Sequence, residues 1–224
     1  MDLARFIDHT FLKPAATLPD IEQLCVEAAQ YNFCAVCVPP PFVKRAKSLL
    51  GPTPVKIATV IGFPFGYSAT EAKVAESLLA LVDGADELDV VINLIALKMG
   101  DWNYVTKEIA LLTTVVHNKH KEIKVIVESG ILTEEEIIRC CTALGPLGID
   151  FMKTSTGYAE KSASIEAVQL MKACLPPGVQ IKASGGIRTY EFARSLVEAG
   201  AGRLGCSASV AIVQQAPGFT ADGY

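Results

Sequence analysis

The sequence predicts a single-domain α/β protein, a (β/α)8 TIM barrel. Short β-like runs alternate with amphipathic segments along the chain, which is typical of a parallel sheet. The 224 residues suit eight such strand–helix units, because barrels of this kind have about 250 residues. An open doubly wound sheet is the main alternative, but no Gly-x-Gly-x-x-Gly follows the first predicted strand.

The predicted strands are short, apolar and followed by turns. In chain order they cover residues 6–10, 35–38, 56–61, 87–93, 124–129, 150–154, 179–184 and 203–206. The predicted helices cover residues 19–31, 69–83, 101–120, 133–144, 164–174 and 190–199. Thr133, with Glu136 three residues later, has the pattern of a capping box. Three glycines lie where helices should end, each just before a strand: Gly84, Gly148 and Gly200.

No linker-like or low-complexity stretch divides the chain. Residues 1–216 are therefore expected to form one barrel domain. Residues 217–224 are rich in glycine and alanine, and we expect a flexible tail there.

Composition narrows the classes of function. The net charge of −4 without basic clusters argues against a nucleic-acid partner. The most apolar stretch, residues 88–97, is interrupted by Asp89 and Asn93 and is too short to cross a membrane. No secretory signal is visible at the N-terminus, and seven cysteines, mostly in apolar runs, indicate reduced thiols in a cytoplasm. The three histidines form no ligand cluster, so no metal is expected.

Strand side chains alternate between two faces, and charges fall opposite the apolar face of several strands. In a barrel the apolar face meets the helices, so the charged face should point inward. Four charges lie early in their strands and should form a structural ion network low in the barrel: Lys56, Glu87, Lys124 and Arg203. Four others lie near the carboxyl ends of strands, where barrel active sites lie: Asp89, Glu128, Lys153 and Lys182.

Two lysines on neighbouring strands suggest imine chemistry. A lysine attacks a carbonyl only after losing its proton, and burial or a second cation lowers its pKa. The second cation must stay protonated, which a carboxylate such as Asp89 would favour. The spacing leaves open whether Lys153 or Lys182 forms the imine. It also leaves open a purely structural ion network.

Two glycine-containing loops predict a phosphate site. Gly185 and Gly186 follow the seventh strand, and glycines let backbone N–H groups approach an anion. Gly205 lies near the end of the eighth strand, Ser207 follows that strand, and both precede the last helix, whose N-terminus would favour an anion. Barrels commonly bind phosphate between these two loops, so a phosphorylated carbonyl compound is the expected substrate.

Along nearly its whole length the chain resembles the 2-deoxyribose-5-phosphate aldolases, a family of class I, Schiff-base aldolases. The similar stretches include residues 7–14, 60–64, 84–93 and 124–130. The most specific are Asp150-Phe151-Met152-Lys153-Thr154-Ser155-Thr156-Gly157 and Lys182-Ala183-Ser184-Gly185-Gly186-Ile187-Arg188.

The resemblance implies reversible cleavage of 2-deoxy-D-ribose 5-phosphate to acetaldehyde and D-glyceraldehyde 3-phosphate, as in deoxyribose phosphate catabolism. It implies that Lys153 forms the imine, that Lys182 lowers the pKa of Lys153, and that Asp89 transfers protons with Lys182. It places phosphate at the two loops, and implies a cytoplasmic homodimer or tetramer without cofactor. Accessory positions are Asp8, Thr10, Thr154, Thr156 and the C-terminal Tyr224.

Two positions depart from the pattern of some family members. Tyr158 stands where some have a basic residue, and Ala208 where some have a second serine, which should weaken phosphate binding. Two alternatives stay open: another Schiff-base barrel aldolase with a different sugar phosphate, and a catalytically silent barrel that only binds one.

Overall fold

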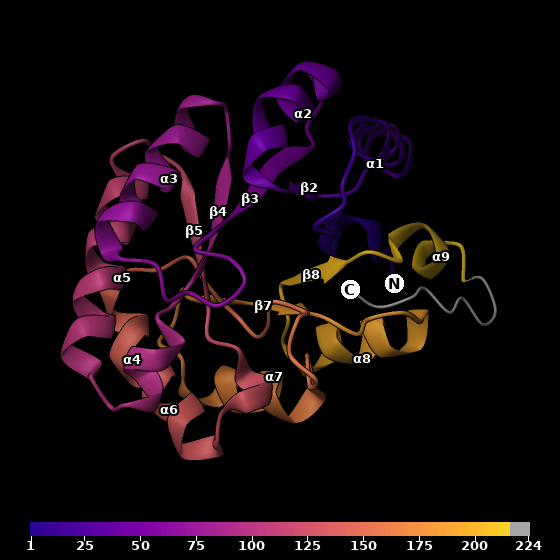
Figure 1. Ribbon diagram of the computed structural model, residues 1–224. Coiled ribbons are helices and arrows are strands. Elements are labelled where there is room, and N and C mark those ends of the chain that lie inside the picture. The colour runs from indigo at the N-terminus through magenta and orange to yellow at the C-terminus, as the bar shows by residue number, and fades with distance from the viewer. Residues whose placement is uncertain (216–224) are drawn as a thin grey trace.

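Parallel strands close into a barrel, with the helices around the outside, in the computed structural model, which describes residues 1–215 (Figure 1). The strands pair in sequence order, and β8 closes the ring on β1. This confirms the predicted fold class. The strands are β1 (Ile7–Thr10), β2 (Ala35–Val38), β3 (Lys56–Ile61), β4 (Glu87–Val91), β5 (Glu122–Ile126), β6 (Phe151–Lys153), β7 (Gln180–Ser184) and β8 (Arg203–Cys206).

The helices join successive strands and cover the barrel. They are α1 (Leu18–Tyr31), α2 (Val43–Leu50), α3 (Thr70–Val82), α4 (Leu94–Lys98), α5 (Trp102–His117), α6 (Glu134–Leu144), α7 (Ile165–Cys174), α8 (Tyr190–Ala199) and α9 (Ser209–Val213). Short 3-10 turns lie at η1 (Ala4–Phe6), η2 (Pro40–Phe42), η3 (Ser129–Ile131) and η4 (Gly145–Leu147). No helix in residues 1–215 has the length and apolar character needed to cross a membrane.

The helix boundaries follow capping chemistry. Thr133 caps α6: its hydroxyl accepts from the backbone N–H of Glu136, and the Glu136 carboxylate accepts from the backbone N–H of Thr133. The predicted strand 87–93 ends at Val91 because Asn93 caps α4, accepting from the backbone N–H of Ala96. The predicted helix 101–120 ends at His117.

Most of the apolar core lies between the strands and the helices. Outward-facing strand residues such as Ile57, Leu88, Val90 and Ile181 pack there against the helices, almost fully buried. Inside the barrel a small cluster, which includes Leu12, Cys37, Ala58 and Val60, fills part of the space. Much of the rest of the interior is charged, as strand alternation predicts, and the Phe151 ring packs among these charges.

The predicted domain boundary at residue 216 and the predicted tail, residues 217–224 with Tyr224, lie outside the described residues.

Candidate active site

Three lysines surround one buried carboxylate in the middle of the barrel. Lys153 Nζ lies 2.7 Å and Lys182 Nζ lies 2.6 Å from the same oxygen of Asp89, Oδ2. Lys124 Nζ donates to the other oxygen, Oδ1, at 2.9 Å. Asp89 is fully buried, so these ammonium groups replace the water that would otherwise solvate it. The structure thus brings together the three residues predicted as catalytic.

The network continues toward the amino ends of the strands. Asp8 links Lys182, 2.5 Å away, to Arg203, also 2.5 Å away. Glu87 binds Lys124 at 2.5 Å and Arg203 at 2.8 Å. At the amino-terminal rim of the barrel, the Lys56 ammonium pairs with both Glu87 and Glu122. The predicted structural ion network is present, and Asp8 belongs to it.

Lys124 lies higher in the barrel than predicted. β5 begins at Glu122, two residues before the predicted start, and its register pairs Lys124 with Asp89 rather than with Glu87. Its side chain therefore reaches carboxylates in two layers of the barrel, Glu87 and Asp89. Sequence reasoning missed this second cation because its place depends on where β5 begins.

The buried network has one positive charge too many when all its lysines are protonated. The buried network holds three carboxylates, Asp8, Glu87 and Asp89, and four basic groups, Lys124, Lys153, Lys182 and Arg203. Lys56 is balanced by Glu122. Removing one proton from one lysine leaves three negative and three positive charges, and this balanced state has the lowest electrostatic free energy for a buried cluster.

The local environments determine which lysine loses that proton. Burial lowers the pKa of Lys153, and the Lys182 cation lowers it further, against the attraction of Asp89. Burial alone would lower the pKa of Lys182, but Asp8 and Asp89 together raise it above its ordinary value. For Lys124, Asp89 and Glu87 likewise outweigh burial and raise the pKa. Burial would raise the pKa of Asp89, yet the three lysines hold it well below its usual range.

A cavity of about 380 Å³ opens at the carboxyl ends of the strands, and Lys153 lies in its wall. The wall also contains all four predicted phosphate residues and two predicted accessory ones: Gly185, Gly186, Gly205, Ser207, Thr10 and Thr156. The carboxylates and the other two lysines of the network do not line it. Lys153 is therefore the lysine that a ligand in this cavity would meet.

The remaining predicted accessory residue, Thr154, lies behind the cavity wall. It is fully buried, and its hydroxyl accepts from the backbone N–H of Ser184 at 3.1 Å. This bond joins β6 to β7 beyond the two lysines. Thr154 thus fixes the strand ends rather than facing the cavity.

The loop between β6 and α7 forms part of the cavity wall that sequence reasoning missed. Its residues 157, 159, 160, 162 and 163 line the cavity. A side chain at Gly185 would lie 2.6 Å from the Cβ of Ser162, and φ of Gly185 is +86°, so this position requires glycine. The sequence showed that residue 185 is a glycine, but it did not show that the loop between β6 and α7 packs against it.

Glu128 is one of the four charges predicted near the carboxyl ends of strands, and its carboxylate organises the loop after β6. It is buried, and it accepts from the backbone N–H of Thr156 at 3.2 Å and from the Thr156 hydroxyl. Burial raises the pKa of Glu128. Glu128 therefore holds Thr156 at the cavity wall.

The two departures from the family pattern occupy packed positions. The Tyr158 hydroxyl donates to the carbonyl oxygen of Leu12 at 3.0 Å, and its ring packs edge-on against Phe63. Ala208 is buried just before α9. Arg188 and Lys153 are the basic residues among the described residues of the cavity wall. α9 spans only five residues, so its N-terminus contributes little field for an anion.

Among residues 1–215 no group of three or more His, Cys, Asp or Glu side chains is arranged to hold a metal ion. The expectation that the reaction needs neither metal nor another cofactor stays a prediction.

Comparison with known proteins places the chain in a family. Residues 3–215 match the model of the DeoC/LacD family aldolases. The chain is 52% identical over 218 residues to the deoxyribose-phosphate aldolase of Thermococcus gammatolerans, covering 96% of this chain and 97% of the relative. It is 46% identical to that of Bacillus mycoides, over the full length of both. The structure of the Aeropyrum pernix deoxyribose phosphate aldolase superposes with a TM-score of 0.89 at 33% identity, covering 95% of this chain and 89% of that one. The chain belongs to the DeoC/LacD family of aldolases.

Proposed function

We propose that this protein is a deoxyribose-phosphate aldolase that cleaves 2-deoxy-D-ribose 5-phosphate reversibly to acetaldehyde and D-glyceraldehyde 3-phosphate, with Lys153 as the nucleophile. One observation carries the role of Lys153. Of the three lysines on Asp89, it alone lines the cavity, and its pKa is the one that its surroundings lower. The full-length similarity to deoxyribose-phosphate aldolases supports the choice of substrate.

The bond changes follow from imine chemistry. The neutral Nζ of Lys153 adds to the C1 aldehyde, and loss of water gives a protonated imine. The C2–C3 bond then breaks, its electron pair enters the imine system as an enamine, and the C3 hydroxyl loses its proton to become the aldehyde of glyceraldehyde 3-phosphate. The enamine takes a proton at C2, and water releases acetaldehyde from Lys153.

Lys182 and Asp89 have complementary roles in this scheme. Lys182 stays charged between Asp8 and Asp89, and its cation disfavours a proton on Lys153. Because Lys182 and Lys153 share one oxygen of Asp89, the pair Lys182–Asp89 is placed to pass protons to and from the reacting atoms. Lys124 supplies a second fixed cation on the far oxygen.

The phosphate end of the substrate is proposed to bind at the two glycine-containing loops. Gly185, Gly186, Gly205 and Ser207 line the cavity, and Arg188 in the same wall is a source of positive charge. Thr10 and Thr156 also line the cavity and offer hydroxyls to the substrate. Tyr224, which lies outside the described residues, remains a proposed proton-transfer residue.

Product analysis tests this reaction against its alternatives. Purified protein with 2-deoxyribose 5-phosphate should release acetaldehyde and glyceraldehyde 3-phosphate in equal amounts, measured by coupled reduction with NADH. Release of a different aldehyde from a different sugar phosphate would indicate another Schiff-base aldolase. Binding of deoxyribose 5-phosphate without turnover would indicate a silent barrel.

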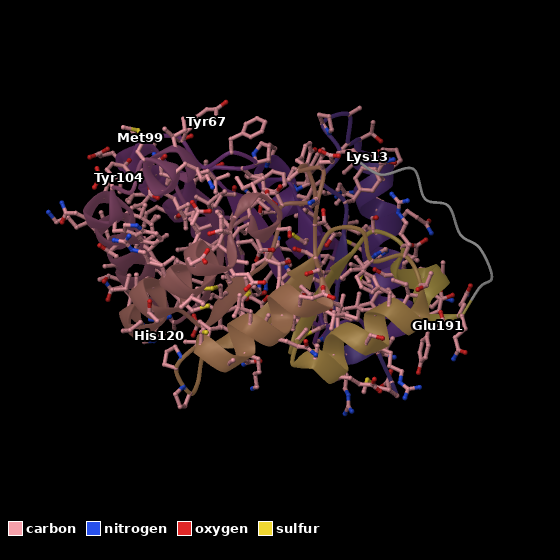
Figure 2. The ribbon with its side chains drawn as sticks, turned by 90° about the horizontal axis from the view of Figure 1, so that it is seen from below. Lys13, Tyr67, Met99, Tyr104, His120 and Glu191 are labelled. Carbon is pink, nitrogen blue, oxygen red and sulfur yellow. The ribbon has the colours of Figure 1, made fainter. Side chains whose placement is uncertain are left out.

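We also propose a homodimer, or a tetramer built from it, in the cytoplasm. Exposed apolar side chains support an interface: Phe65 and Tyr67 on the loop before α3, Ile95 on α4, and Met99 directly after α4. Figure 2 shows Tyr67 and Met99 toward the same end of the molecule. The Aeropyrum pernix relative is described as tetrameric. Seven cysteines as free thiols agree with a reducing compartment.

A further inference from the structure

His9 lies behind the phosphate side of the cavity, outside the barrel. It sits on β1 between Asp8, which points inward, and Thr10, which lines the cavity. Its own side chain points the other way, toward α1 and α9, and is buried, with 3% exposed. The backbone of His9 pairs with Cys206 on β8. Neither the ion network nor the cavity wall includes His9.

A continuous chain of hydrogen bonds runs through this histidine. Nε2 of His9 lies 2.8 Å from Oε2 of Glu27 on α1, and Nδ1 lies 2.9 Å from Oγ of Ser209, the first residue of α9. Ser209 Oγ also lies 2.9 Å from the carbonyl oxygen of Cys206. The other carboxylate oxygen of Glu27 accepts from Gln23 at 2.7 Å. Helix α1 is thus tied through one imidazole to Ser209 at the start of α9, and the Ser209 hydroxyl lies within hydrogen-bond distance of the end of β8.

This series of hydrogen-bonding groups ends at Cys206, directly behind the loop proposed to hold phosphate. Cys206 lies between Gly205 and Ser207, both of which line the substrate cavity. A second cavity of about 170 Å³ lies behind this loop, and Thr10 and Ser207 border both cavities. His9 and Glu27 border the rear one. His9 therefore lies behind the loop and does not line the front cavity.

The hydrogen of Ser209 has two acceptors in reach and can serve only one at a time. With neutral His9, the Nε2–H donates to Glu27 and Nδ1 accepts from the Ser209 hydroxyl. With protonated His9, Nδ1–H donates to Ser209 Oγ, and the Ser209 hydroxyl donates to the Cys206 carbonyl. The protonation of His9 thus decides whether that carbonyl, in the middle of the loop, receives a side-chain hydrogen bond.

The groups around His9 favour the neutral form. Burial lowers the pKa of His9, and the Glu27 carboxylate opposes this only in part. From β8 the titratable neighbour is the Cys206 thiol, which burial keeps neutral by raising its pKa. From α9 the neighbour is the uncharged Ser209, and from the segment after α1 it is the ring of Phe33, 5.1 Å from the imidazole. Asp20 on α1 also borders the rear cavity.

We propose that His9 is a positioning residue that holds the loop 205–207 in its phosphate-binding shape by anchoring Ser209, which closely follows that loop. The inference rests on the proposed function, because it requires the phosphate to bind at this loop. Loss of the imidazole should weaken binding of the phosphate end and leave the imine chemistry at Lys153 intact.

The test compares substrates with and without phosphate. We expect His9→Leu to raise KM for deoxyribose 5-phosphate about three- to tenfold, the worth of one hydrogen bond, while kcat and the kcat/KM for unphosphorylated 2-deoxyribose change little. The inhibition constant of inorganic phosphate should rise in parallel. His9→Asn, whose amide can replace Nδ1 toward Ser209, should restore most of the affinity. Ser209→Ala should reproduce the effect of His9→Leu without removing the histidine.

His117→Gln is the matched control. His117 also pairs with a carboxylate, Asp150, at 2.9 Å, but the pair is partly exposed and lies away from the loop. The His117→Gln variant should keep the unmodified KM and kcat for both substrates. As pH falls and His9 gains a proton, the ratio of KM in the unmodified enzyme to KM in His9→Asn should change. The ratio is used because the ionisation of the substrate phosphate affects both enzymes equally and cancels.

The outcomes separate the two proposals. If the unmodified enzyme cleaves deoxyribose 5-phosphate but folded His9→Leu and Ser209→Ala keep its KM and the phosphate inhibition constant, the positioning role is overturned. A pH-independent KM ratio would overturn the hydrogen-bond switch. If the unmodified enzyme cleaves neither substrate, the proposed function itself fails.

Discussion

At the scale of residues, the site is defined by an asymmetry among three lysines on one aspartate. Lys182 and Lys124 each have a second carboxylate, Asp8 and Glu87 respectively. Lys153 has only Asp89 as an ion-pair partner in the described residues, and it must share that carboxylate with the other two. A lysine with one shared anion is the natural one to lose its proton in a buried cluster.

Lys182→Leu should reverse this asymmetry. Removing the cation frees Asp89 to attract Lys153 more strongly, so the pKa of Lys153 should rise and turnover at neutral pH should be nearly lost. The alkaline rise of the pH–rate profile should move to higher pH. Steady-state kinetics across pH measure this, with circular dichroism to verify folding.

Lys121→Leu is a control for that variant, because Lys121 pairs with Asp86 and lies outside the buried network. It should keep normal turnover. Near-normal activity of a folded Lys182→Leu enzyme at neutral pH would refute the role of Lys182.

The sequence predicted the gathering of Asp89, Lys153 and Lys182 because strand alternation has a strict period of two. Strand alternation did not predict which lysine reacts, since that depends on distances between strands far apart in the chain; the choice of Lys153 came from the family resemblance. The predicted position of Lys124, low in the barrel, was wrong. The predicted strand begins at residue 124, two residues after the actual start of β5, and this shifts the register by one layer.

At the scale of elements, local chemistry marks the boundaries. The bounds of β2, β3 and β8 agree with the predicted ranges, because each is a compact apolar run followed by a turn or a short helix. α2 was not among the predicted helices: it has only eight residues and follows the run Pro39-Pro40-Pro41, which is typical of a loop. The loop from β6 to α7 was not predicted as cavity wall because loop paths depend on tertiary contacts.

The capping box of α6 offers a test at this scale. Thr133→Ala removes the hydroxyl that accepts from the Glu136 N–H, and should lower the free energy of unfolding by about 1 kcal/mol. Turnover should not change, because the cap lies away from the cavity wall. Urea denaturation measures the stability.

Thr142→Ala, on the exposed side of the same helix, is the control and should be neutral or slightly stabilising. Equal stability of Thr133→Ala and the unmodified protein would show that the cap does not hold this helix.

At the scale of the whole molecule, the barrel combines an apolar shell with a charged interior. The shell between strands and helices supplies stability by burial. The interior must be kept charge-balanced, and a depressed lysine pKa opposes folding at neutral pH. Between the lowered pKa and the ordinary value near 10.4, the unfolded chain binds a proton at residue 153 that the folded chain does not, so stability rises with pH in that window.

Lys153→Met should therefore abolish turnover yet stabilise the fold at neutral pH, by about 1.4 kcal/mol for each unit by which the pKa is lowered. Three carboxylates and three basic groups remain in balance. Lys182→Met should do the opposite, because it leaves Asp8 and Asp89 short of a cation, at a loss of roughly 3–5 kcal/mol. Thermal unfolding at pH 7 measures both, and equal destabilisation by the two variants would contradict a neutral Lys153.

The most direct measurement of the central claim is covalent trapping. The protein is incubated with acetaldehyde and sodium borohydride, which reduces an imine to a stable ethyl amine, and the modified residue is mapped by peptide mass spectrometry. We expect one ethyl group, on Lys153, and none after Lys153→Met. An ethyl group on Lys182 or Lys124 instead, or no label at all, would contradict it.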